Sequence, residues 1–345
     1  DSQIMLVRTD ALGNELWSKL YGGSQNEFPT DLEIEPDENL LIAANVEEAI
    51  SGQTDVMFLR VNLEGAVLDS VVFGSPNVTE GVNSITVVSD GDIIGVGTTS
   101  DVDTQKPGFN AATDLIDFFS IRMNRSFVQA ESFQWKRVVG YPGIDRGQKI
   151  IERPDGGFIM FGTSNDPNSN SQQEGFNMIV FPTNELGDIG SSFEVQYYGT
   201  LGNESAAQIV ETIDGGYSMV GTSVQENSRS MFVARVRSDV GFVNSNTINI
   251  EPDIIATSIT ASSSGGFFQL GTSNASSSGN ILLVKTNDAG ALEWSQEFGG
   301  LDDDVSGKVL QMTDGSLAIV GSIELESQKK MALIKTNRLG EFNAN

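Results

Sequence analysis

Residues 280–322 read NILLVKTNDAGALEWSQEFGGLDDDVSGKVLQMTDGSLAIVGS, and this stretch decides the fold. It contains four short apolar or alternating segments that we expect to be β-strands: Ile281–Thr286, Ala291–Gly299, Gly307–Thr313 and Ser316–Gly321. Turns rich in Asn, Asp and Gly separate them, and these residues favour tight reversals of the chain. Four strands in a unit of about 40 residues are typical of one blade of a β-propeller.

A hairpin marker recurs along the chain, because a tight turn with glycine is repeatedly followed by a second glycine. The pairs are Gly91 and Gly97, Gly156 and Gly162, Gly215 and Gly221, Gly265 and Gly271, and Gly315 and Gly321. An Asp-Gly turn between two apolar runs predicts a β-hairpin, since a type I′ turn needs positive φ angles. A weaker copy over residues 36–44 lacks the glycines.

Two further markers accompany each hairpin. Apolar runs that end in a basic residue predict a third strand: Ile4–Arg8, Val56–Arg60, Phe118–Arg122, Met231–Arg235, Ile281–Lys285 and Met331–Lys335. Segments that often carry an aromatic residue and end in glycine predict a fourth strand, as in Leu16–Gly22 and Leu292–Gly299. Trp17, Trp135 and Trp294 share one position of this fourth segment, so we expect them to pack between blades.

These markers predict an all-β fold, a single β-propeller domain of four-stranded blades over residues 1–345. The blades are expected at residues 31–74, 82–140, 147–199, 206–250, 256–299 and 307–342, with residues 1–23 closing the ring. Pairing of the N- and C-terminal strands would close a six-bladed ring and remove exposed sheet edges. Seven blades are the alternative because there are seven third strands once Asn177–Pro182, with proline at the basic position, is counted. A pair of β-sandwiches is the alternative architecture.

The repeat resembles a known group of proteins. Residues 156–164 (GGFIMFGTS), 215–223 (GGYSMVGTS) and 265–273 (GGFFQLGTS) carry the resemblance, together with residues 280–300. They are similar to the tandem-repeat β-propellers of secreted proteins and surface lipoproteins of Bacteroidota, with a strand order like that of kelch blades. The resemblance implies a propeller fold and an exported protein at the outer membrane or cell surface, but it implies no activity.

Composition excludes several kinds of function. The chain has 345 residues, no cysteine, no histidine and a formal net charge of −27. Disulfides, thiolate metal sites and histidine-dependent catalysis are therefore excluded, and nucleic acid and anionic lipid are disfavoured electrostatically. No apolar run is long enough to span a membrane. The start at Asp1 has no charged-then-apolar leader, which we interpret as a mature or trimmed chain and as a hint of export. The resemblance to surface lipoproteins leaves room for a lipid anchor upstream of Asp1.

Fold logic divides the loops between two faces. The connections from outermost to innermost strand, and from second to third strand, should open on one face with the insertions Ser100–Leu115 and Asn165–Gly175. We therefore predict this insertion-bearing face to be the binding face. Its loop acids include Glu27, Glu80, Asp145, Glu204 and Asp304. Its loop aromatics, Phe28, Phe109 and Tyr141, are the predicted partner-binding residues.

The sequence contains few candidate metal-binding or catalytic residues. Asp302, Asp303 and Asp304 are a weak calcium candidate, because they lack the spacing of a calcium loop, and a solvated acidic loop is favoured instead. Nothing distinguishes a catalytic pair among 47 acidic residues. We therefore assign no catalytic residue and no cofactor, and do not expect an enzyme.

The sequence favours a non-catalytic protein-binding or scaffolding module. The resemblance implies an outer-membrane lipoprotein, or a subunit of a larger envelope complex, whose partners are other envelope proteins. The alternative is a carbohydrate-binding or carbohydrate-cleaving propeller, which could depend on calcium.

Overall fold

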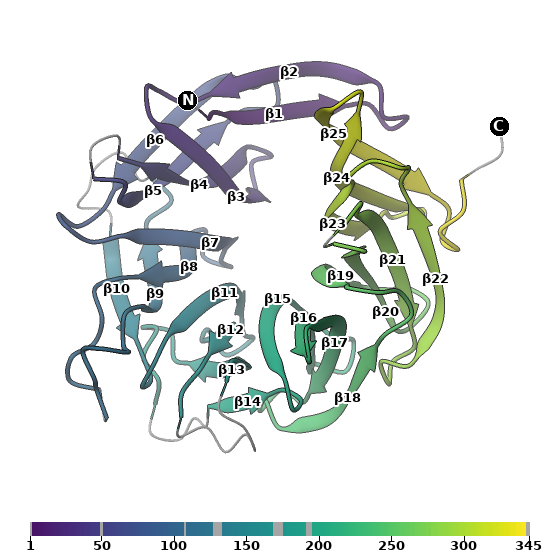
Figure 1. The fold of residues 1–345 in the computed structure, drawn as a ribbon. Helices are drawn as coiled ribbons and strands as arrows, with labels where there is room; N and C mark the ends of the chain where they lie inside the picture. The colour runs from purple at the N-terminus through teal and green to yellow at the C-terminus, as the bar shows by residue number, and fades with distance from the viewer. Residues whose placement is uncertain are drawn as a thin grey trace. The chain divides into compact units, whose positions relative to one another are not determined.

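The structure, a computed structural model, describes residues 2–48, 51–106, 108–126, 133–167, 175–190, 195–275 and 277–342. Over these residues the chain is built from β-strands, turns and loops, without helices (Figure 1). Accordingly, none of the described residues forms a helix that could cross a membrane. The chain divides into two compact units: residues 1–169 with 180–195, and residues 170–179 with 196–345.

The strands of the first unit begin with the pair β1 (Ile4–Thr9) and β2 (Glu15–Tyr21). The first blade is β3 (Asn26–Ile34), β4 (Leu40–Glu47), β5 (Thr54–Val61) and β6 (Val67–Phe73). The second blade is β7 (Glu80–Val87), β8 (Ile93–Thr99), β9 (Asp117–Met123) and β10 (Phe133–Val139). The third blade contains β11 (Asp145–Glu152), β12 (Phe158–Ser164), β13 (Asn177–Thr183) and β14 (Gln196–Tyr198). Residues 177–179 of β13 and all of β14 belong to the second unit.

The remaining blades belong to the second unit. The fourth blade is β15 (Asn203–Glu211), β16 (Tyr217–Gln225), β17 (Ser228–Val236) and β18 (Phe242–Ile248). The fifth is β19 (Ile255–Ala261), β20 (Phe267–Ser273), β21 (Asn280–Thr286) and β22 (Leu292–Phe298). The sixth is β23 (Val305–Gln311), β24 (Leu317–Leu325) and β25 (Gln328–Thr336).

Each blade is a sheet of strands that are consecutive in the chain. Five sheets have four strands, and the sixth has three among the described residues. In the fifth blade the pairs β19–β20, β20–β21 and β21–β22 are all antiparallel. This up-and-down order is that of propeller blades. The predicted all-β propeller with six blades is thereby confirmed, whereas a single domain over residues 1–345 stays a prediction.

The predicted pairing of the N- and C-terminal strands is not found. β1 and β2 form a two-stranded sheet of their own, and β25 is hydrogen-bonded to β24 in the last sheet. Ile4–Arg8 in β1 and Met331–Lys335 in β25 are both third strands of the repeat, and each pairs with its neighbour in the chain.

A bulge in every innermost strand explains the second glycine of the hairpin marker. The register shifts lie between Pro29/Asp31, Val82/Ser84, Gly147/Lys149, Ala206/Gln208, Ala256/Ser258 and Ser306/Lys308. At each of the five glycines a carbonyl near the bulge lies where a side chain would begin. A Cβ atom on Gly162 would lie 1.9 Å from the carbonyl oxygen of Arg146. The glycine is therefore required by close approach of the backbone and not by its φ angle.

Gly162→Ala is expected to lower the free energy of unfolding by about 2–3 kcal/mol, because the new methyl group must displace a backbone carbonyl. The matched control is Gly271→Ala, whose Cβ would lie 2.8 Å from the carbonyl oxygen of Ile255 and needs a smaller shift. Urea unfolding of both variants measures the difference. Equal losses in the two variants would contradict this explanation of the repeat glycine.

The tryptophans pack between blades, as predicted. Cβ positions on Gly65, Gly187 and Gly340 lie 3.0, 2.7 and 3.0 Å from the indole rings of Trp17, Trp135 and Trp294, respectively. Each glycine belongs to the turn between the third and fourth strands of the following blade. These three indoles therefore help to hold consecutive blades together.

Candidate functional site

The acids at the start of the innermost strands are structural. Glu27, Glu80, Asp145, Glu204 and Asp304 are all buried. Four of them accept a hydrogen bond from a backbone N–H of the preceding loop. The donors are Gly23 to Glu27 (2.9 Å), Ser75 to Glu80 (3.0 Å), Tyr141 to Asp145 (2.6 Å) and Gly300 to Asp304 (3.0 Å). Because these carboxylates hold the loops, they do not form the exposed acidic binding face that the sequence predicted.

A glycine at the end of most outermost strands makes room for these carboxylates and for the first residue of the third strand. A Cβ atom on Gly140 would lie 2.2 Å from the carboxyl carbon of Asp117. A Cβ on Gly299 would lie 2.2 Å from Asn280 and 2.6 Å from Asp304. Asn177 and Asn280 are uncharged, but Asp55 and Asp117 place a second carboxylate beside the buried acid.

Lysines neutralise the two places where both residues are acidic. Lys136 is ion-paired with Glu80, close to Asp55. Lys106, which lies in the insertion and is buried, has its Nζ atom 2.6 Å from Asp117 and 3.8 Å from Asp114. The buried ion pair between Lys106 and Asp117 therefore attaches the insertion to the second blade.

Asp145 and Asp117 are two carboxylates of this cluster whose pKa values are raised. Burial raises the pKa of Asp145 to about 7, and the charge of Asp117 contributes to the rise. Burial also raises the pKa of Asp117, against the lowering effect of Lys106. The side chain of Asp145 is fully buried. This cluster stores electrostatic strain.

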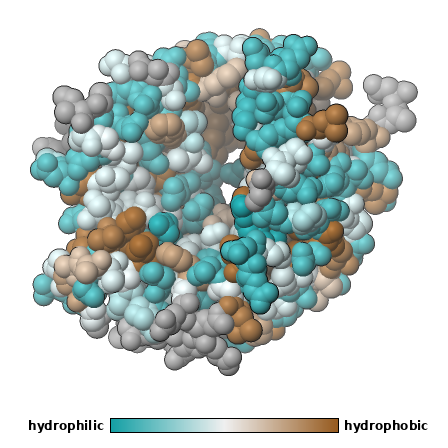
Figure 2. All heavy atoms as spheres, in the orientation of Figure 1, coloured by the Kyte–Doolittle hydropathy of each residue, from teal (hydrophilic) through white to brown (hydrophobic). Residues whose placement is uncertain are grey.

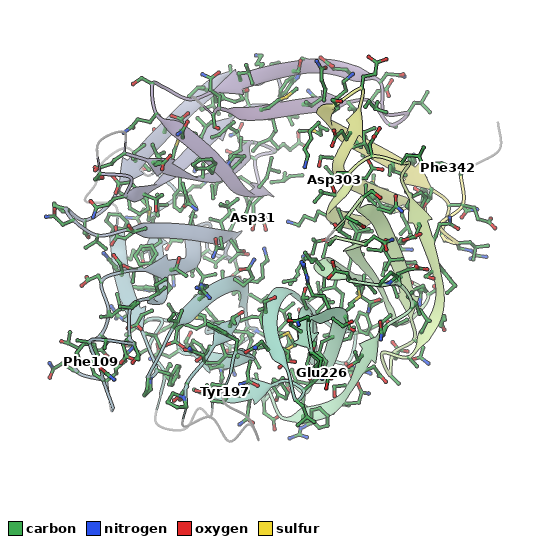
Figure 3. All side chains as sticks on the ribbon, viewed as in Figure 1. Asp31, Phe109, Tyr197, Glu226, Asp303 and Phe342 are labelled. Carbon is green, nitrogen blue, oxygen red and sulfur yellow. The ribbon has the colours of Figure 1, made fainter. Side chains whose placement is uncertain are left out.

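The predicted partner-binding aromatics all lie in the first unit but in different settings. Phe28 lies in β3 with 44% of its surface exposed. Phe109 is half-buried in the insertion beside β9 and β10 (Figure 3). The Tyr141 ring is half-buried and makes an edge contact with Phe181 at 6.2 Å. Burial raises the pKa of Tyr141.

The predicted calcium candidates do not converge. Asp304 accepts hydrogen bonds from the backbone N–H groups of Gly300 and Glu324, both at 3.0 Å. The carboxylate of Asp303 is paired with Lys329 at 2.9 Å, and Asp302 is exposed. No group of three or more acidic side chains among the described residues is arranged to hold a metal ion.

A pocket of about 330 Å³ lies in the second unit, on the face of the short turns and not on the insertion-bearing face. It is formed by the hairpin turn before β20, the turn after β21 and the turn after β25. Its polar and aromatic lining residues are Ser264, Lys285, Asn287, Asp288, Glu293, Trp294 and Arg338. The neighbouring surface of β21–β25, at the right of Figure 2, is mostly hydrophilic.

In four other copies of the repeat an arginine fills the corresponding space, whereas the third blade has Pro182 at this position. The basic residue that ends the third strand donates to a carbonyl in the next blade's turn. The contacts are Arg8 to Leu63 (2.6 Å), Arg60 to Arg125 (2.7 Å), Arg122 to Glu185 (3.5 Å) and Arg235 to Asp288 (2.9 Å). Trp17 donates its indole N–H to Leu63 as well, at 3.1 Å.

The pocket opens because Lys285 replaces that arginine. Its Nζ atom turns back to the carbonyls of Gly265 (2.8 Å) and Thr286 (2.7 Å) and to the carboxylate of Glu293 (3.0 Å). No hydrogen bond of the described residues joins Lys285 or Trp294 to the carbonyl of Arg338, which is equivalent to Leu63.

The hairpin turn also departs from the repeat. In other blades an acid of this turn pairs with the third-strand arginine, as Asp214 does with Arg235 at 2.6 Å. The fifth blade has the turn Ser262–Gly266 instead, with no acidic residue. The shorter side chains leave the space between the turns unfilled.

The groups around the pocket suit a polar, uncharged or singly charged ligand. One oxygen of Asp288 accepts a hydrogen bond from the backbone N–H of Gly266 at 2.8 Å. The carboxylate of Glu293 is paired with Lys285. Trp294 adds an aromatic surface that is half-buried, and Arg338 is exposed. Small polar pockets with an aromatic wall and a few fixed polar groups bind oriented small molecules.

A smaller cavity of about 120 Å³ lies in the first unit and is lined mainly by Phe73, Phe119 and Phe133. Its charged groups, Glu80 and Lys136, are paired with each other. The charged side chains that line this cavity are therefore partners in a structural ion pair.

Comparison with solved structures shows the fold class of this chain. A protein of unknown function from Dyadobacter fermentans is 11% identical, with a TM-score of 0.59 over 91% of this chain and 95% of that chain. An α-L-arabinanase from Penicillium chrysogenum, complexed with arabinobiose, is 13% identical, with a TM-score of 0.55 over 91% and 93% of the two chains. A sialidase from Streptococcus pneumoniae is 8% identical, with a TM-score of 0.56 over 91% and 68%.

No family model and no curated protein matches the sequence. At these identities the structural likeness shows the fold alone.

Proposed function

We propose that this propeller binds a saccharide in the pocket beside Trp294. The observation that carries the proposal is the gap left where Lys285 fails to bridge to the turn of Arg338. That gap combines an indole, a serine hydroxyl and two carboxylates, so hydrogen-bond donors and acceptors surround an aromatic surface. The arabinanase and sialidase among the structural neighbours favour a carbohydrate over other small polar ligands.

Binding is favoured over cleavage by the state of the two carboxylates. Glycoside hydrolysis needs one carboxyl group as a proton donor and a second as a nucleophile or base. Here Glu293 is paired with Lys285, and Asp288 accepts a backbone N–H, so both carboxylates are already engaged as hydrogen-bond acceptors. We therefore propose a lectin-like role for this pocket.

Lys285→Arg is expected to abolish saccharide binding, because the repeat's own geometry lets an arginine reach the next turn and fill the gap. A glycan array identifies the saccharide bound by the wild-type protein, and calorimetry then compares the variants. We expect at least a tenfold loss of affinity, about 1.4 kcal/mol, with no loss of thermal stability.

The control is Lys335→Arg, the same change at the equivalent position of β25, outside the pocket lining. It should bind like the wild-type protein. Equal binding by Lys285→Arg and wild type, or no glycan bound by the wild-type protein, would overturn the proposed site.

A second candidate function is docking of another envelope protein by an exported, outer-membrane-anchored form of this chain. The exposure of Phe28 at the surface of the first blade favours it. Phe109 and Tyr141 stay proposed contact residues. Purification of the tagged protein from its source membrane would return a stoichiometric partner if this candidate is correct, and the protein alone if it is not.

A further inference from the structure

We infer that the saccharide carries a carboxylate, and that Arg338 selects for it. This inference rests on the proposed function, because it concerns the same pocket. It names the ligand as an acidic sugar of the uronic acid kind.

Lys285 is not available to a ligand. Its three N–H groups have three acceptors, the carbonyls of Gly265 and Thr286 and the carboxylate of Glu293. The lysine is only 5% exposed, and its Nζ atom also lies 5.5 Å from the Phe268 ring centre. An ammonium group satisfied in this way has no donor left for a ligand.

Arg338, in contrast, is available to a ligand. Its side chain is exposed at the rim of the pocket, and none of the ion pairs between described residues includes it. Most basic side chains of this acidic protein are paired, as Arg235 is with Asp214 and Lys329 is with Asp303. A guanidinium offers two parallel N–H groups that match the two oxygens of a carboxylate.

The turn that carries Arg338 is fixed independently of this side chain. The side chain of Asn337 accepts hydrogen bonds from the backbone N–H groups of Leu339 (2.8 Å) and Glu341 (3.0 Å). Gly340, with a φ angle of 76°, packs against Trp294. The guanidinium is therefore presented beside the indole by a turn that does not need it for folding.

The remaining charges set the expected ligand. The net charge of −27 repels anions at long range, so selection for a carboxylate has to come from close contact. The second carboxylate oxygen of Asp288 accepts no hydrogen bond from the described residues, so it can accept a sugar hydroxyl in the pocket that Arg338 also lines. A uronic acid offers hydroxyl donors to Asp288, a ring face to Trp294 and a carboxylate to Arg338.

The test uses pairs of methyl glycosides that differ only in a carboxylate or a hydroxymethyl group at C6. Methyl glucuronide is compared with methyl glucoside, and methyl galacturonide with methyl galactoside, by ligand-observed NMR titration. We expect the wild-type protein to bind at least one uronide at least tenfold more tightly than its neutral partner. Arg338→Gln should lose this preference while keeping the affinity for the neutral glycoside within about twofold.

The control is Lys330→Gln, which removes one positive charge from exposed β25 outside the pocket lining. It should keep the preference for the uronide. Equal binding of uronide and neutral glycoside by the wild-type protein, or an unchanged preference in Arg338→Gln, overturns the inference and leaves the saccharide site standing. If none of the four glycosides binds, the inference fails, and the glycan array then decides whether the proposed function fails with it.

Discussion

Lys106→Met is expected to lower the free energy of unfolding by about 3–5 kcal/mol, the usual cost of leaving a buried charge without its partner. Lys106 and Asp117 are both buried and lie 2.6 Å apart. Methionine matches the length of the lysine stem but removes the charge. Asp117 would then stay buried beside Asp145 with no cation, and would have to take up a proton or draw water into the blade.

The repeat supplies the compensating variant. At the equivalent positions of β13 and β21 the chain has Asn177 and Asn280. Lys106→Met combined with Asp117→Asn should therefore recover most of the lost stability. Asparagine can still accept the backbone N–H of Asp103, which is now 2.7 Å from Asp117.

Urea unfolding of the single and double variants at neutral pH measures both effects. A double variant no more stable than the single one would show that Lys106 acts by packing and not by neutralising Asp117.

Asp145→Asn is expected to stabilise the protein at pH 8 by up to about 4 kcal/mol, and by much less at pH 5. The pKa of Asp145 is raised from the ordinary 3.8 to about 7 by burial, and one pKa unit corresponds to about 1.36 kcal/mol. Asparagine keeps an oxygen to accept the N–H of Tyr141 but removes the charge.

The direction follows from proton binding. Between about pH 4 and pH 7 the folded protein holds a proton on Asp145 that the unfolded chain has released. Stability due to this group therefore falls as pH rises through that window and is constant above it. The advantage of the asparagine variant should grow over the same window.

Unfolding of wild type and variant at pH 5, 6, 7 and 8 gives the difference at each pH, in which the other titrating groups largely cancel. A stabilisation that is the same at pH 5 and pH 8 would contradict a buried, charged Asp145.

Much of the fold could be predicted from the sequence because its determinants are local. Gly156 and Gly215 mark hairpin turns by their need for positive φ angles, which are 83° and 76° in the structure. The alternation of apolar residues places the strands, and the equivalence of Trp17 and Trp294 predicts packing between blades. Closure by the terminal strands stays a prediction, because the strand pairs of the described residues join β1 to β2 and β25 to β24.

The site could not be predicted in the same way, because it depends on distances between blades. Glu80 and Asp145 look like exposed loop acids in the sequence, and only the backbone N–H groups of Ser75 and Tyr141 show that they are buried supports. One residue of the sequence does indicate the pocket. Lys285 stands where Arg235 stands one blade earlier, but the two were grouped as basic residues.

The missing hydrogen bond from Lys285 to the next blade's turn also affects how the second unit unfolds. In an array of blades, cooperativity is transmitted through links between nearest neighbours. The arginine that joins the fourth blade to the fifth, Arg235, has no counterpart between the fifth and sixth. Separating the sixth blade from the fifth therefore breaks one such link fewer than separating the fifth from the fourth. The junction that has room to hold a ligand is thus one that lacks this arginine link, and an occupied pocket would restore a connection between the fifth and sixth blades.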